Sequence, residues 1–385
     1  MSDTYRVALL FSMSGEFGRM IWRGIQQYVK AHGHWVPQVF ADYRPEAGKA
    51  VATWKPDGII SGTPNRKLLD SIRSSGIPIV CASIQFPELE LPQVGLDDVS
   101  VGQLVADEYL RRGFRNLAFV GMHTPFSERR LRGYRRSADR AGVSVHTCIS
   151  PGTSTNRYRQ IARIEKQLCD FLRHLPKPAG LMACNDSNAA YVEEMCREED
   201  LRVPEDVAIV GVDNDPLMCE LAECPISSVQ IPGVKLGYQA AELLDGLMHG
   251  EPAPNIPVLL EPLGIVTRHS SDTLVVDDPV ISRAVAFMRA NAAEPIGVDD
   301  IADEVAVSRR SLERKFHRKL ERSVYSELMH IRIEMAKHLL LDTDLKLETI
   351  ALQCGFSNSS RLCYAFRNAV GTTPKGYRRQ AVPVK

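Results

Sequence analysis

The first 268 residues alternate short apolar runs with segments of helical periodicity. Runs that are apolar on both faces and bounded by Gly or Pro are typical of buried parallel strands. Such runs are Arg6–Ser12, Asp57–Gly62, Ile77–Ser83, Asn116–Gly121, Ala179–Asp186 and Val207–Asp215. Between them, Val101–Arg111 places its apolar side chains on one helical stripe. The repeated order of strand, helix and strand predicts an α/β domain with a doubly wound parallel sheet, and the length suffices for two such sheets.

Polar side chains follow several of these strands at their carboxyl ends. They are Ser12 and Ser14, Asp97 and Asp98 after Gln93–Leu96, Asn185 and Asp186, and Asp213, Asn214 and Asp215. In open α/β sheets this edge is where ligands bind. Amides, hydroxyls and carboxylates suit a polyol, because each sugar hydroxyl both donates and accepts hydrogen bonds. The alternative for each Asp or Asn is an N-cap of the following helix, but the cluster as a whole favours a ligand.

An enzyme active site at the same edge is the competing interpretation, and the sequence gives it little support. The chain has no GxGxxG after a strand, no GxxxxGK[ST] and no GxSxG. We therefore expect no catalytic residues and no cofactor. The ten histidines form no HExxH, and the nine cysteines form no CxxC pair, which argues against a metal site and for reduced thiols. The N-terminal residues MSDTYRVALLFS lack a secretory pattern, which predicts a cytoplasmic protein.

The formal charge of the chain is zero, but it is divided unevenly. Residues 1–278 contain 29 Lys and Arg against 35 Asp and Glu, a net charge of −6. Residues 279–385 contain 18 against 12, a net charge of +6. The basic residues are densest between Arg309 and Arg322. This asymmetry indicates two functionally different parts, of which the smaller meets a polyanion; the alternative is a solvated helix face.

The basic part contains an internal repeat. Ile301-Ala302, Val305-Ala306-Val307-Ser308, Leu312 and Phe316 correspond to Ile350-Ala351, Cys354-Gly355-Phe356-Ser357, Leu362 and Phe366. The second copy has one extra residue after its serine. Each copy predicts a helix, a tight turn at Ala306 or Gly355, and a second helix that Ser308 or Ser357 can cap.

The second helix of the first copy combines a buried stripe with a basic outer face. Leu312, Phe316 and Leu320 anchor one side, which leaves Arg309, Arg310, Glu313 and Arg314 pointing away. Such a helix fits the major groove of DNA, where Arg can bond guanine in bidentate fashion. An ordinary helical hairpin with solubilising charges is the alternative, and the duplication together with the serine caps argues against it.

The α/β part resembles the LacI-type sugar-sensing core, a type I periplasmic-binding-protein fold with two lobes and a hinge crossed three times. The resemblance rests on LLFSMSGEFGRMIWRGI (9–25), ERRLRGY (128–134), ACNDSNA (183–189) and above all LRVPEDVAIVGVDND (201–215). It implies ligand-binding positions at Ser12, Phe17, Asp97, Arg130, Asn185 and Asp213. For Asp97, helix capping is the stronger alternative, and Asp186 is expected to orient Asn185 or to cap its helix. Unlike LacI, the sequence has no DNA-binding headpiece before Tyr5.

The basic part resembles the AraC/XylS DNA-binding domain. The resemblance rests on ADEVAVSRRSLERKFHRKL (302–320), RIEMAKHLL (332–340) and ETIALQCGFSNSSRLCYAFRNAVGTTPKGYR (348–378). It implies an all-α domain with two helix-turn-helix units on one face of DNA. The implied base-reading positions are Arg309, Arg310, Glu313 and Arg314 in the first copy, and Asn358, Ser359, Ser360, Arg361 and Tyr364 in the second. Tyr364 replaces a frequent Arg, and Lys375, Arg378 and Arg379 are expected to meet phosphates.

Together these resemblances predict a sensor at residues 1–268, a linker at 269–280 and an AraC-type domain at 281–385. A chain of this uncommon build is similar to a small group of sugar-operon regulators. The similarity implies a homodimeric activator that binds D-xylose and then tandem DNA sites beside a promoter, where it would meet RNA polymerase. Three alternatives stay open: the same build sensing another sugar or polyol, an enzyme fused to a DNA-binding domain, and a scaffold whose α/β part serves dimerisation.

Overall fold

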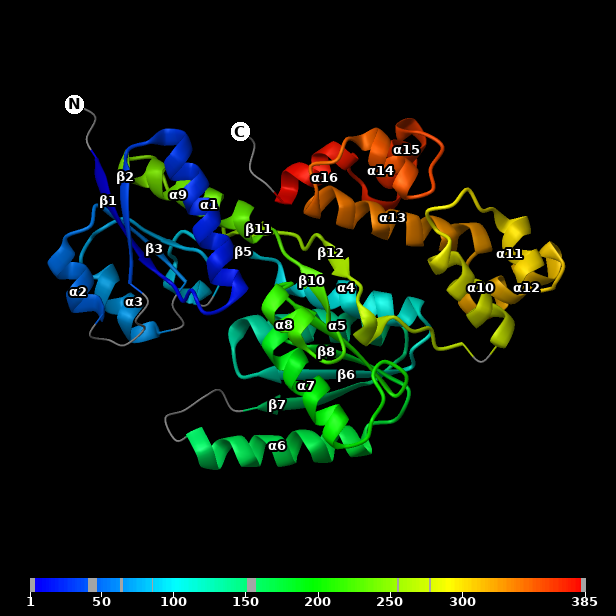
Figure 1. Cartoon of the computed structure of the whole chain (residues 1–385). Helices are drawn as coiled ribbons and strands as arrows, with labels where there is room; N and C mark the ends of the chain where they lie inside the picture. Colours follow the sequence, from blue (N-terminus) through cyan, green and yellow to red (C-terminus); the bar gives the residue numbers. More distant parts are fainter. Residues whose placement is uncertain are drawn as a thin grey trace. The chain divides into compact units, whose positions relative to one another are not determined.

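The computed structural model describes residues 4–40, 47–62, 65–84, 86–150, 157–254, 256–276 and 278–381. They form two compact units (Figure 1). The first consists mainly of Met1–Ala106 and Asn116–Ser271, and the second consists of Asp107–Arg115 with Asp272–Gln380. The boundary at Ser271 and Asp272 lies inside the segment that the sequence predicts as a linker. The grouping of Asp107–Arg115 with the second unit was not predicted.

The first lobe of the first unit is a four-stranded parallel sheet with helices on both faces. Its elements are β1 (Tyr5–Leu10), β2 (Trp35–Val39), β3 (Gly58–Ser61), β4 (Ile79–Cys81), α1 (Glu16–His32), α2 (Ala47–Trp54), α3 (Arg66–Arg73), the 3-10 turn η1 (Pro87–Leu89) and α9 (Gly233–Met248). The strand order is β2-β1-β3-β4. Because side chains alternate along a strand, Val7 and Leu9 of β1 pack with α1 and α9, while Ala8 and Leu10 pack with α2 and α3.

The second lobe is a six-stranded sheet in the order β12-β10-β9-β8-β6-β7. Its elements are β6 (Asn116–Met122), β7 (Val145–Ser150), β8 (Ala179–Ala183), β9 (Val207–Val212), β10 (Ser227–Gln230), β12 (Gly264–Val266), α4 (Asp98–Arg111), α5 (Pro125–Arg140), α6 (Arg157–His174), α7 (Asp186–Glu198), α8 (Pro216–Leu221) and the 3-10 turn η2 (His269–Ser271). All neighbouring strands are parallel except β10 and β12. Buried side chains of β8 and β9 pack against α6 and α7 to form the core of one face.

A short parallel pair of strands, β5 (Val94–Leu96) and β11 (Val258–Leu260), lies where the chain changes lobes. The chain passes between lobes three times: from β5 into α4, from β10 into α9, and from β11 into β12. This arrangement confirms the predicted two-lobed fold. The carboxyl ends of β1 and β9 therefore belong to different lobes, so a ligand held at both ends contacts both lobes.

Four strands of the four-stranded and six-stranded sheets were not predicted: β2, β7, β10 and β12. Strand β10 is internal, but it has four residues, SSVQ, and most of them are polar. Strands β2, β7 and β12 are edge strands, and most side chains of β2 and β7 are partly or fully exposed. A strand of that kind has no continuous apolar run, and β2 even contains Pro37, which an edge strand tolerates. The six predicted runs that do form strands are buried on both faces over most of their length.

The second unit is helical. Its elements are α10 (Pro279–Ala290), α11 (Val298–Glu304), α12 (Arg309–Leu320), α13 (Val324–Asp342), α14 (Leu347–Gln353), α15 (Ser359–Val370) and α16 (Pro374–Ala381). Helix α13 joins two helix-turn-helix modules, α11–α12 and α14–α15 (Figure 1). Leu312 and Phe316 lie in the core of the first module, and Phe366 packs edge-on against Tyr377 in the second, with 5.3 Å between ring centroids.

The end of α4 contributes to a buried ion-pair cluster of the second unit. Glu327 is 1% exposed and accepts hydrogen bonds from Arg111 at 2.8 Å and from Arg322 at 2.6 Å. Although burial disfavours its charge, these two arginines hold the pKa of Glu327 below its usual value. Glu108 pairs with Arg111 and Arg112 next to it. These paired charges explain why Asp107–Arg115 groups with the second unit.

Candidate ligand pocket and DNA-reading surface

A cavity of about 290 Å³ lies at the carboxyl ends of the strands in the first unit. Its volume is close to the lower end of the range for small-molecule sites. Five of the six predicted ligand-binding residues line it: Ser12, Phe17, Arg130, Asn185 and Asp213. The first two come from the loop and helix after β1, and the other three come from the second lobe. The cavity therefore lies between the lobes, as the family resemblance implies.

The loop after β1 presents hydroxyls to the cavity. Ser12 Oγ lies 2.6 Å from Ser14 Oγ and accepts a hydrogen bond from the backbone N–H of Ser14 at 3.2 Å. The first turn of α1 packs so closely on this loop that a Cβ on Gly18 would lie 1.8 Å from the carbonyl oxygen of Ser12. Gly18 is therefore required for the loop to keep Ser12 and Ser14 at the cavity.

Asp98 anchors two arginines of the second lobe. Arg130 Nε donates to Asp98 Oδ1 at 2.9 Å, and Arg129 Nη2 donates to Asp98 Oδ2 at 2.8 Å. A further nitrogen of Arg130 donates to the carbonyl oxygen of Cys184. Although burial alone would lower the pKa of Arg130, Asp98 and Asp213 raise it, so Arg130 stays charged. The guanidinium is thus fixed in place before any ligand arrives.

Close packing of α4 and α5 brings these residues together. A Cβ on Gly102 would lie 1.9 Å from the carbonyl oxygen of Arg130, and one on Gly133 would lie 1.9 Å from that of Val99. The two helices therefore cross with backbone almost in contact, which places Asp98 at the start of α4 next to Arg130 on α5. Replacing either glycine would separate the ion pair.

Asp213 faces the cavity from the end of β9 in an unusual backbone conformation. Its φ angle is 109°, and that of Asn214 is 52°, both in a region that side chains other than glycine rarely adopt. Arg130 lies 4.0 Å from Asp213 Oδ1. Burial raises the pKa of Asp213, although Arg130 opposes the shift. A strained, incompletely bonded carboxylate at a cavity is typical of a binding site.

The predicted polar residues Asn185 and Asp186 have different positions and partners near the cavity. Asn185 lines the cavity and also caps α7, since its Oδ1 accepts from the backbone N–H of Asn188 at 2.9 Å. Asp186 is buried and accepts from Ser228 Oγ at 2.5 Å and from the backbone N–H of Asp215 at 2.7 Å. Asp186 therefore fixes the segment that carries Asp213. The expectation that Asp186 orients Asn185 or caps α7 is wrong: Asn185 is the cap, and within the described part of the chain Asp186 forms no bond to Asn185.

Asp97 does not line the cavity. Its carboxylate accepts from the backbone N–H groups of Val99 and Ser100 and from Ser100 Oγ, at 2.8–3.1 Å. It thus caps the start of α4, and the neighbouring Asp98 takes the place that the sequence comparison gave to Asp97. Helix phase explains the difference: at the first turn of α4 the two adjacent side chains point in different directions, and Asp98 is the one turned toward α5.

Several other cavity residues were not predicted, notably Phe126, Arg129, Ser83 and Ile84. Phe126 lies in the first turn of α5, with the Arg130 guanidinium 5.0 Å from its ring centroid. Its position after β6, at the carboxyl end of a buried strand, is the signal that would have indicated it. Ser83 and Ile84 follow β4 in the same way.

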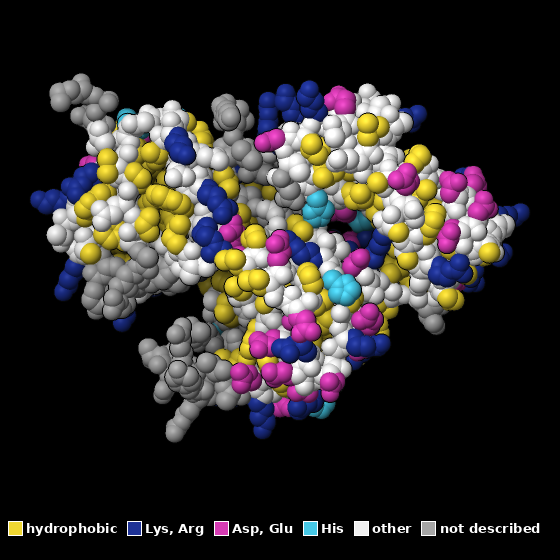
Figure 2. Space-filling view, viewed as in Figure 1, with side chains coloured by type: hydrophobic (Ala, Val, Ile, Leu, Met, Phe, Trp, Pro, Cys, Tyr) yellow, Lys and Arg dark blue, Asp and Glu magenta, His cyan; other side chains and the backbone are white. Residues whose placement is uncertain are grey.

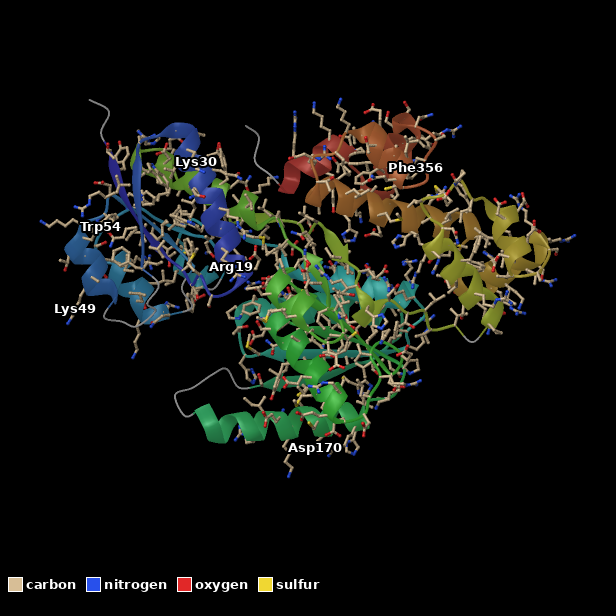
Figure 3. The ribbon with its side chains drawn as sticks, viewed as in Figure 1. Arg19, Lys30, Lys49, Trp54, Asp170 and Phe356 are labelled. Carbon is tan, nitrogen blue, oxygen red and sulfur yellow. The ribbon has the colours of Figure 1, made fainter. Side chains whose placement is uncertain are left out.

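An ion pair bridges the two lobes beside the cavity. Arg19 of α1 donates to Asp215 Oδ2 at 2.8 Å, and the backbone N–H of Glu16 donates to the same oxygen at 3.2 Å. Figure 3 shows Arg19 near the end of α1 that faces the second lobe. Because Asp215 follows Asp213 and caps α8, this contact ties the first lobe to the segment that lines the cavity.

The two helix-turn-helix modules have the predicted turns. Ala306 and Gly355 adopt φ angles of 56° and 72°, the left-handed conformation that reverses the chain. Ser308 caps α12, as predicted, by accepting from the backbone N–H of Ser311 at 3.3 Å. The prediction for Ser357 is wrong: Asn358 caps α15 and accepts from the backbone N–H of Arg361 at 2.9 Å. The extra residue of the second copy shifts the cap by one position.

The predicted base-reading residues of α12 fall into two groups. Arg310 and Arg314 are exposed, and among the described residues neither forms an ion pair or hydrogen bond through its side chain. Arg309 pairs with Asp299 at 2.9 Å, and Glu313 accepts from the backbone N–H of Val324 at 3.2 Å. Arg310 and Arg314 are therefore the freest to contact DNA. Figure 2 shows Lys and Arg side chains at the margin of the second unit, over α12 and α16.

In the second module, Ser360, Arg361 and Tyr364 are exposed on α15, and Tyr364 is 70% exposed. Ser359 donates to Glu348 at 3.3 Å. Of the residues expected at phosphates, Lys375 and Arg379 are exposed, whereas Arg378 donates to the carbonyl oxygens of Leu340 and Leu345 at 3.1 and 2.8 Å. Arg378 thus connects α16 to the end of α13.

Comparison with known proteins agrees with both parts of the chain. Residues 106–271 match the periplasmic binding protein-like domain family, and residues 301–380 match a helix-turn-helix domain family. The xylose operon regulatory protein of Escherichia coli K12 is 28% identical over 382 residues, which cover 97% of each chain. The chain is a DNA-binding transcription regulator that joins a periplasmic-binding-protein-like domain to a helix-turn-helix domain.

Further similarities extend over the same length. The xylose operon regulatory protein of Haemophilus influenzae is 25% identical and covers 97% of this chain and 98% of its own. The structure of the xylose-binding transcription activator XylR has a TM-score of 0.62 and 25% identity, with 98% of both chains covered. The regulator therefore shares its whole two-part build with these relatives, which are regulators by name.

Two general properties of the regulator complete the description. None of the helices in the described part of the chain combines the length and hydrophobicity needed to cross a membrane. The described residues also include no group of three or more His, Cys, Asp and Glu side chains arranged to hold a metal ion. All nine cysteines are free thiols.

Proposed function

We propose that the cavity of the sensor binds a neutral monosaccharide, with D-xylose as the effector, and that the bound sugar controls how a homodimer occupies operator DNA. The residues that we assign to the sugar are Ser12, Phe17, Asp98, Arg130, Asn185 and Asp213. The base-reading residues are Arg310 and Arg314 of α12, with Asn358, Ser360, Arg361 and Tyr364 at the start of α15. Arg309, Glu313 and Ser359 have protein partners and play a smaller part.

The charge balance of the cavity is the observation that carries this proposal. The lining contains Asp98 and Asp213 against Arg129 and Arg130, so with both carboxylates ionised it has no net charge. Both carboxylates and Arg130 are already engaged or close to an opposite charge. A phosphate or carboxylate ligand would have to compete with Asp98 for the arginines. A neutral polyol instead bonds the remaining lone pairs and N–H groups without disturbing the pairs.

The apolar part of the lining fits the same ligand class. Phe17 comes from the first lobe and Phe126 from the second, and Ile84 and Leu96 add aliphatic surface. A sugar ring has apolar C–H faces and polar hydroxyl edges, which such a mixture of side chains can match. D-xylose is our choice among sugars because the relatives that cover the whole chain are named as xylose regulators.

The mechanism that we propose is a shift between two lobe arrangements. A sugar bound to Ser12 and Phe17 of one lobe and to Arg130, Asn185 and Asp213 of the other favours the closed arrangement by its difference in affinity for the two. Each protomer carries two reading modules, so a homodimer carries four, and a changed dimer geometry alters which DNA segments they reach. We propose activation of transcription through RNA polymerase, in the cytoplasm, where the DNA is.

Two alternatives from other classes are tested by the same purified protein. An enzyme fused to a DNA-binding domain would turn over its ligand, whereas a sensor returns it unchanged. A scaffold whose first unit serves dimerisation would bind operator equally with and without sugar and show no thermal shift with any pentose, hexose or polyol.

Asp213→Ala tests the site assignment. We expect the variant to lose the calorimetric signal of D-xylose while it still retards operator DNA in a gel shift, because the reading modules are in the other unit. Asp170→Ala, an exposed aspartate on α6 of the same lobe (Figure 3), is the matched control and should bind sugar normally. An unaltered sugar titration of Asp213→Ala would rule out the assignment.

A further inference from the structure

Arg332 is a buried cation in the middle of α13 that lies outside the lining of the sensor cavity. It is 6% exposed, and among the described residues it forms no ion pair with a carboxylate. Its partners are three backbone carbonyls of the loop between α10 and α11. Nε donates to Ala292 at 3.0 Å, and Nη2 donates to Glu294 at 2.7 Å and to Ile296 at 3.2 Å.

The carbonyl partners explain how the charge is tolerated. They lie just beyond the C-terminus of α10, where the unpaired carbonyls and the helix dipole favour a positive charge. Burial still lowers the pKa of Arg332 from its usual value. A planar guanidinium can reach three carbonyls at once, which the single nitrogen of Lys cannot do. A buried arginine held this way has a defined position that is expensive to change.

The turn of the second module is packed directly against this arginine. Gly355 has φ 72°, and a Cβ there would lie 2.2 Å from the carbonyl oxygen of Ala292, 2.7 Å from Arg332 Nε and 2.9 Å from Arg332 Cζ. Phe356, the next residue, is labelled in Figure 3 beside α13. Three segments therefore meet at one point: the α10–α11 loop of the first module, the middle of α13, and the turn between α14 and α15.

This contact point lies where α13 passes from one module to the other. Val324 and Leu328 in its first half belong to the core of the first module, and α13 also packs on α14 and α15 of the second. A groove at the same place is lined by Ala293, Pro295, Gly355, Arg361 and Tyr364, so the loop of the first module borders the recognition helix of the second. A displacement of the loop would thus move α15.

DNA geometry makes the position of α15 relative to α12 decisive. Recognition helices that read one face of DNA must be about 34 Å apart, one turn of 10–10.5 base pairs, so one base pair corresponds to about 3.4 Å. The 19 residues of α13 span about 28 Å. A helix of that length sets the separation only if the modules cannot rotate about it.

We propose that Arg332, held by the α10–α11 loop and covered by Gly355, is the positioning residue that fixes the separation and phase of the two recognition helices. It makes the regulator discriminate between operators by the spacing of the two sequence elements within one protomer's site. Arg332 touches no base in this role, and it acts through the placement of α15.

The test uses the full chain and a duplex selected from a random-sequence pool by the wild-type protein. Derivatives carry one or two base pairs inserted between the two elements, or one element replaced. For the wild type, inserting one base pair should cost at least about tenfold in affinity, because one module loses its base contacts. Arg332→Gln should lose less than about threefold on the same insertion. Its affinity for the single-element duplex should match the wild type within about twofold.

Arg283→Gln is the matched control, because Arg283 of α10 also donates to a carbonyl, that of Glu304, but lies exposed within one module. It should keep the wild-type spacing penalty. Arg332→Lys, which retains the charge and loses most of the carbonyl bonds, provides the same measurement if Arg332→Gln does not fold. A variant that keeps the full spacing penalty overturns the proposal. So does one that loses affinity for the single-element duplex in parallel, because Arg332 would then act only in the folding of a module.

Discussion

In the sensor cavity, the side chain of Arg130 is 5% exposed and lies 2.9 Å from Asp98 Oδ1. On α12, by contrast, Arg310 and Arg314 are exposed and have no side-chain partner among the described residues. The same residue type is thus neutralised in one region and left unneutralised in the other. In the cavity, the ion pair holds the arginine rigidly and leaves no net charge for a ligand. On α12, the unpaired guanidinium groups can form bidentate hydrogen bonds with an anionic partner that neutralises their charge.

This contrast explains the zero net charge of the chain in physical terms. The sensor region is acidic overall, yet the charges that line its cavity balance. The reading region is basic, and Arg310 and Arg314 of α12 have no side-chain partner among the described residues. The pairing of the charges therefore favours a neutral ligand in the sensor cavity and a polyanion at the reading modules. The net charges of the two regions alone would not lead to this distinction.

Salt concentration should affect DNA binding by the reading modules far more than sugar binding by the sensor. If the reading modules of a dimer neutralise six or more phosphates, operator affinity should fall by about 10³-fold or more between 50 and 200 mM salt. D-xylose affinity should change by less than about twofold over the same range, since no net charge is transferred. Fluorescence anisotropy and calorimetry measure the two quantities. A strongly salt-dependent sugar affinity would show that the cavity is not charge-balanced.

The substitution Asp98→Ala should lower the free energy of unfolding of the sensor. Removing this carboxylate leaves Arg129 and Arg130 without their partner in a buried site, which costs about 3–5 kcal/mol of unfolding free energy. Urea denaturation followed by circular dichroism measures the effect. Asp70→Ala removes a carboxylate that is 50% exposed and also paired with an arginine, and it should cost less than about 1 kcal/mol. Equal losses in the two variants would contradict the buried-pair interpretation.

Arg310→Ala should weaken operator binding by about 1–3 kcal/mol and relax the preference at one base pair. Sugar affinity should stay unchanged, because Arg310 is in the other unit. Arg197→Ala replaces an exposed arginine of the sensor and serves as control. A gel shift in which Arg310→Ala binds operator like the wild type would remove α12 as the recognition helix.

Lower pH should weaken sugar binding but leave the arginine contacts to DNA intact. Burial raises the pKa of Asp213, and Arg130 opposes that shift, while Asp98, Asp215 and Glu16 lie close enough to add to it. If the sugar bonds the ionised carboxylate, affinity is full above this raised pKa and falls as pH decreases through it. We expect a loss of up to about tenfold between pH 8 and pH 6, since each unit of pH below the pKa costs one factor of ten. Calorimetry at the two pH values tests it, and Asp213→Asn should show no such dependence.

The fold was largely predictable, because strands buried on both faces leave continuous apolar runs in the sequence. Of the four strands of the two larger sheets that were not predicted, β2, β7 and β12 lie at sheet edges, and most side chains of β2 and β7 are partly or fully exposed. The fourth, β10, is short and mostly polar. The helix-turn-helix repeat was predictable for a related reason, since each module repeats the same buried positions, such as Phe316 and Phe366. The grouping of Asp107–Arg115 with the second unit depends on ion pairs to residues more than 200 positions away, which no local pattern contains.

The sequence predicted which strand ends form the site, but it did not always predict which residue at a strand end lines the cavity. Ser12, Asn185 and Asp213 follow from strand ends, and Phe17 and Arg130 follow from the family resemblance. The choice between Asp97 and Asp98 depends on the phase of α4, and the choice between Ser357 and Asn358 depends on one inserted residue. Arg129 required the crossing of α4 and α5, which Gly102 and Gly133 permit. Arg332 belongs to the same group, because its partners are 36–40 residues away in the sequence.

The most direct test is a calorimetric titration of D-xylose into the full chain, alone and saturated with its selected operator. We expect one sugar per chain and different dissociation constants in the two samples. By linkage, the same factor must appear when the operator is titrated with and without sugar. Identical sugar affinities in the two samples would contradict the claim that the cavity and the reading modules are coupled. No binding of D-xylose in either sample would contradict the proposed effector.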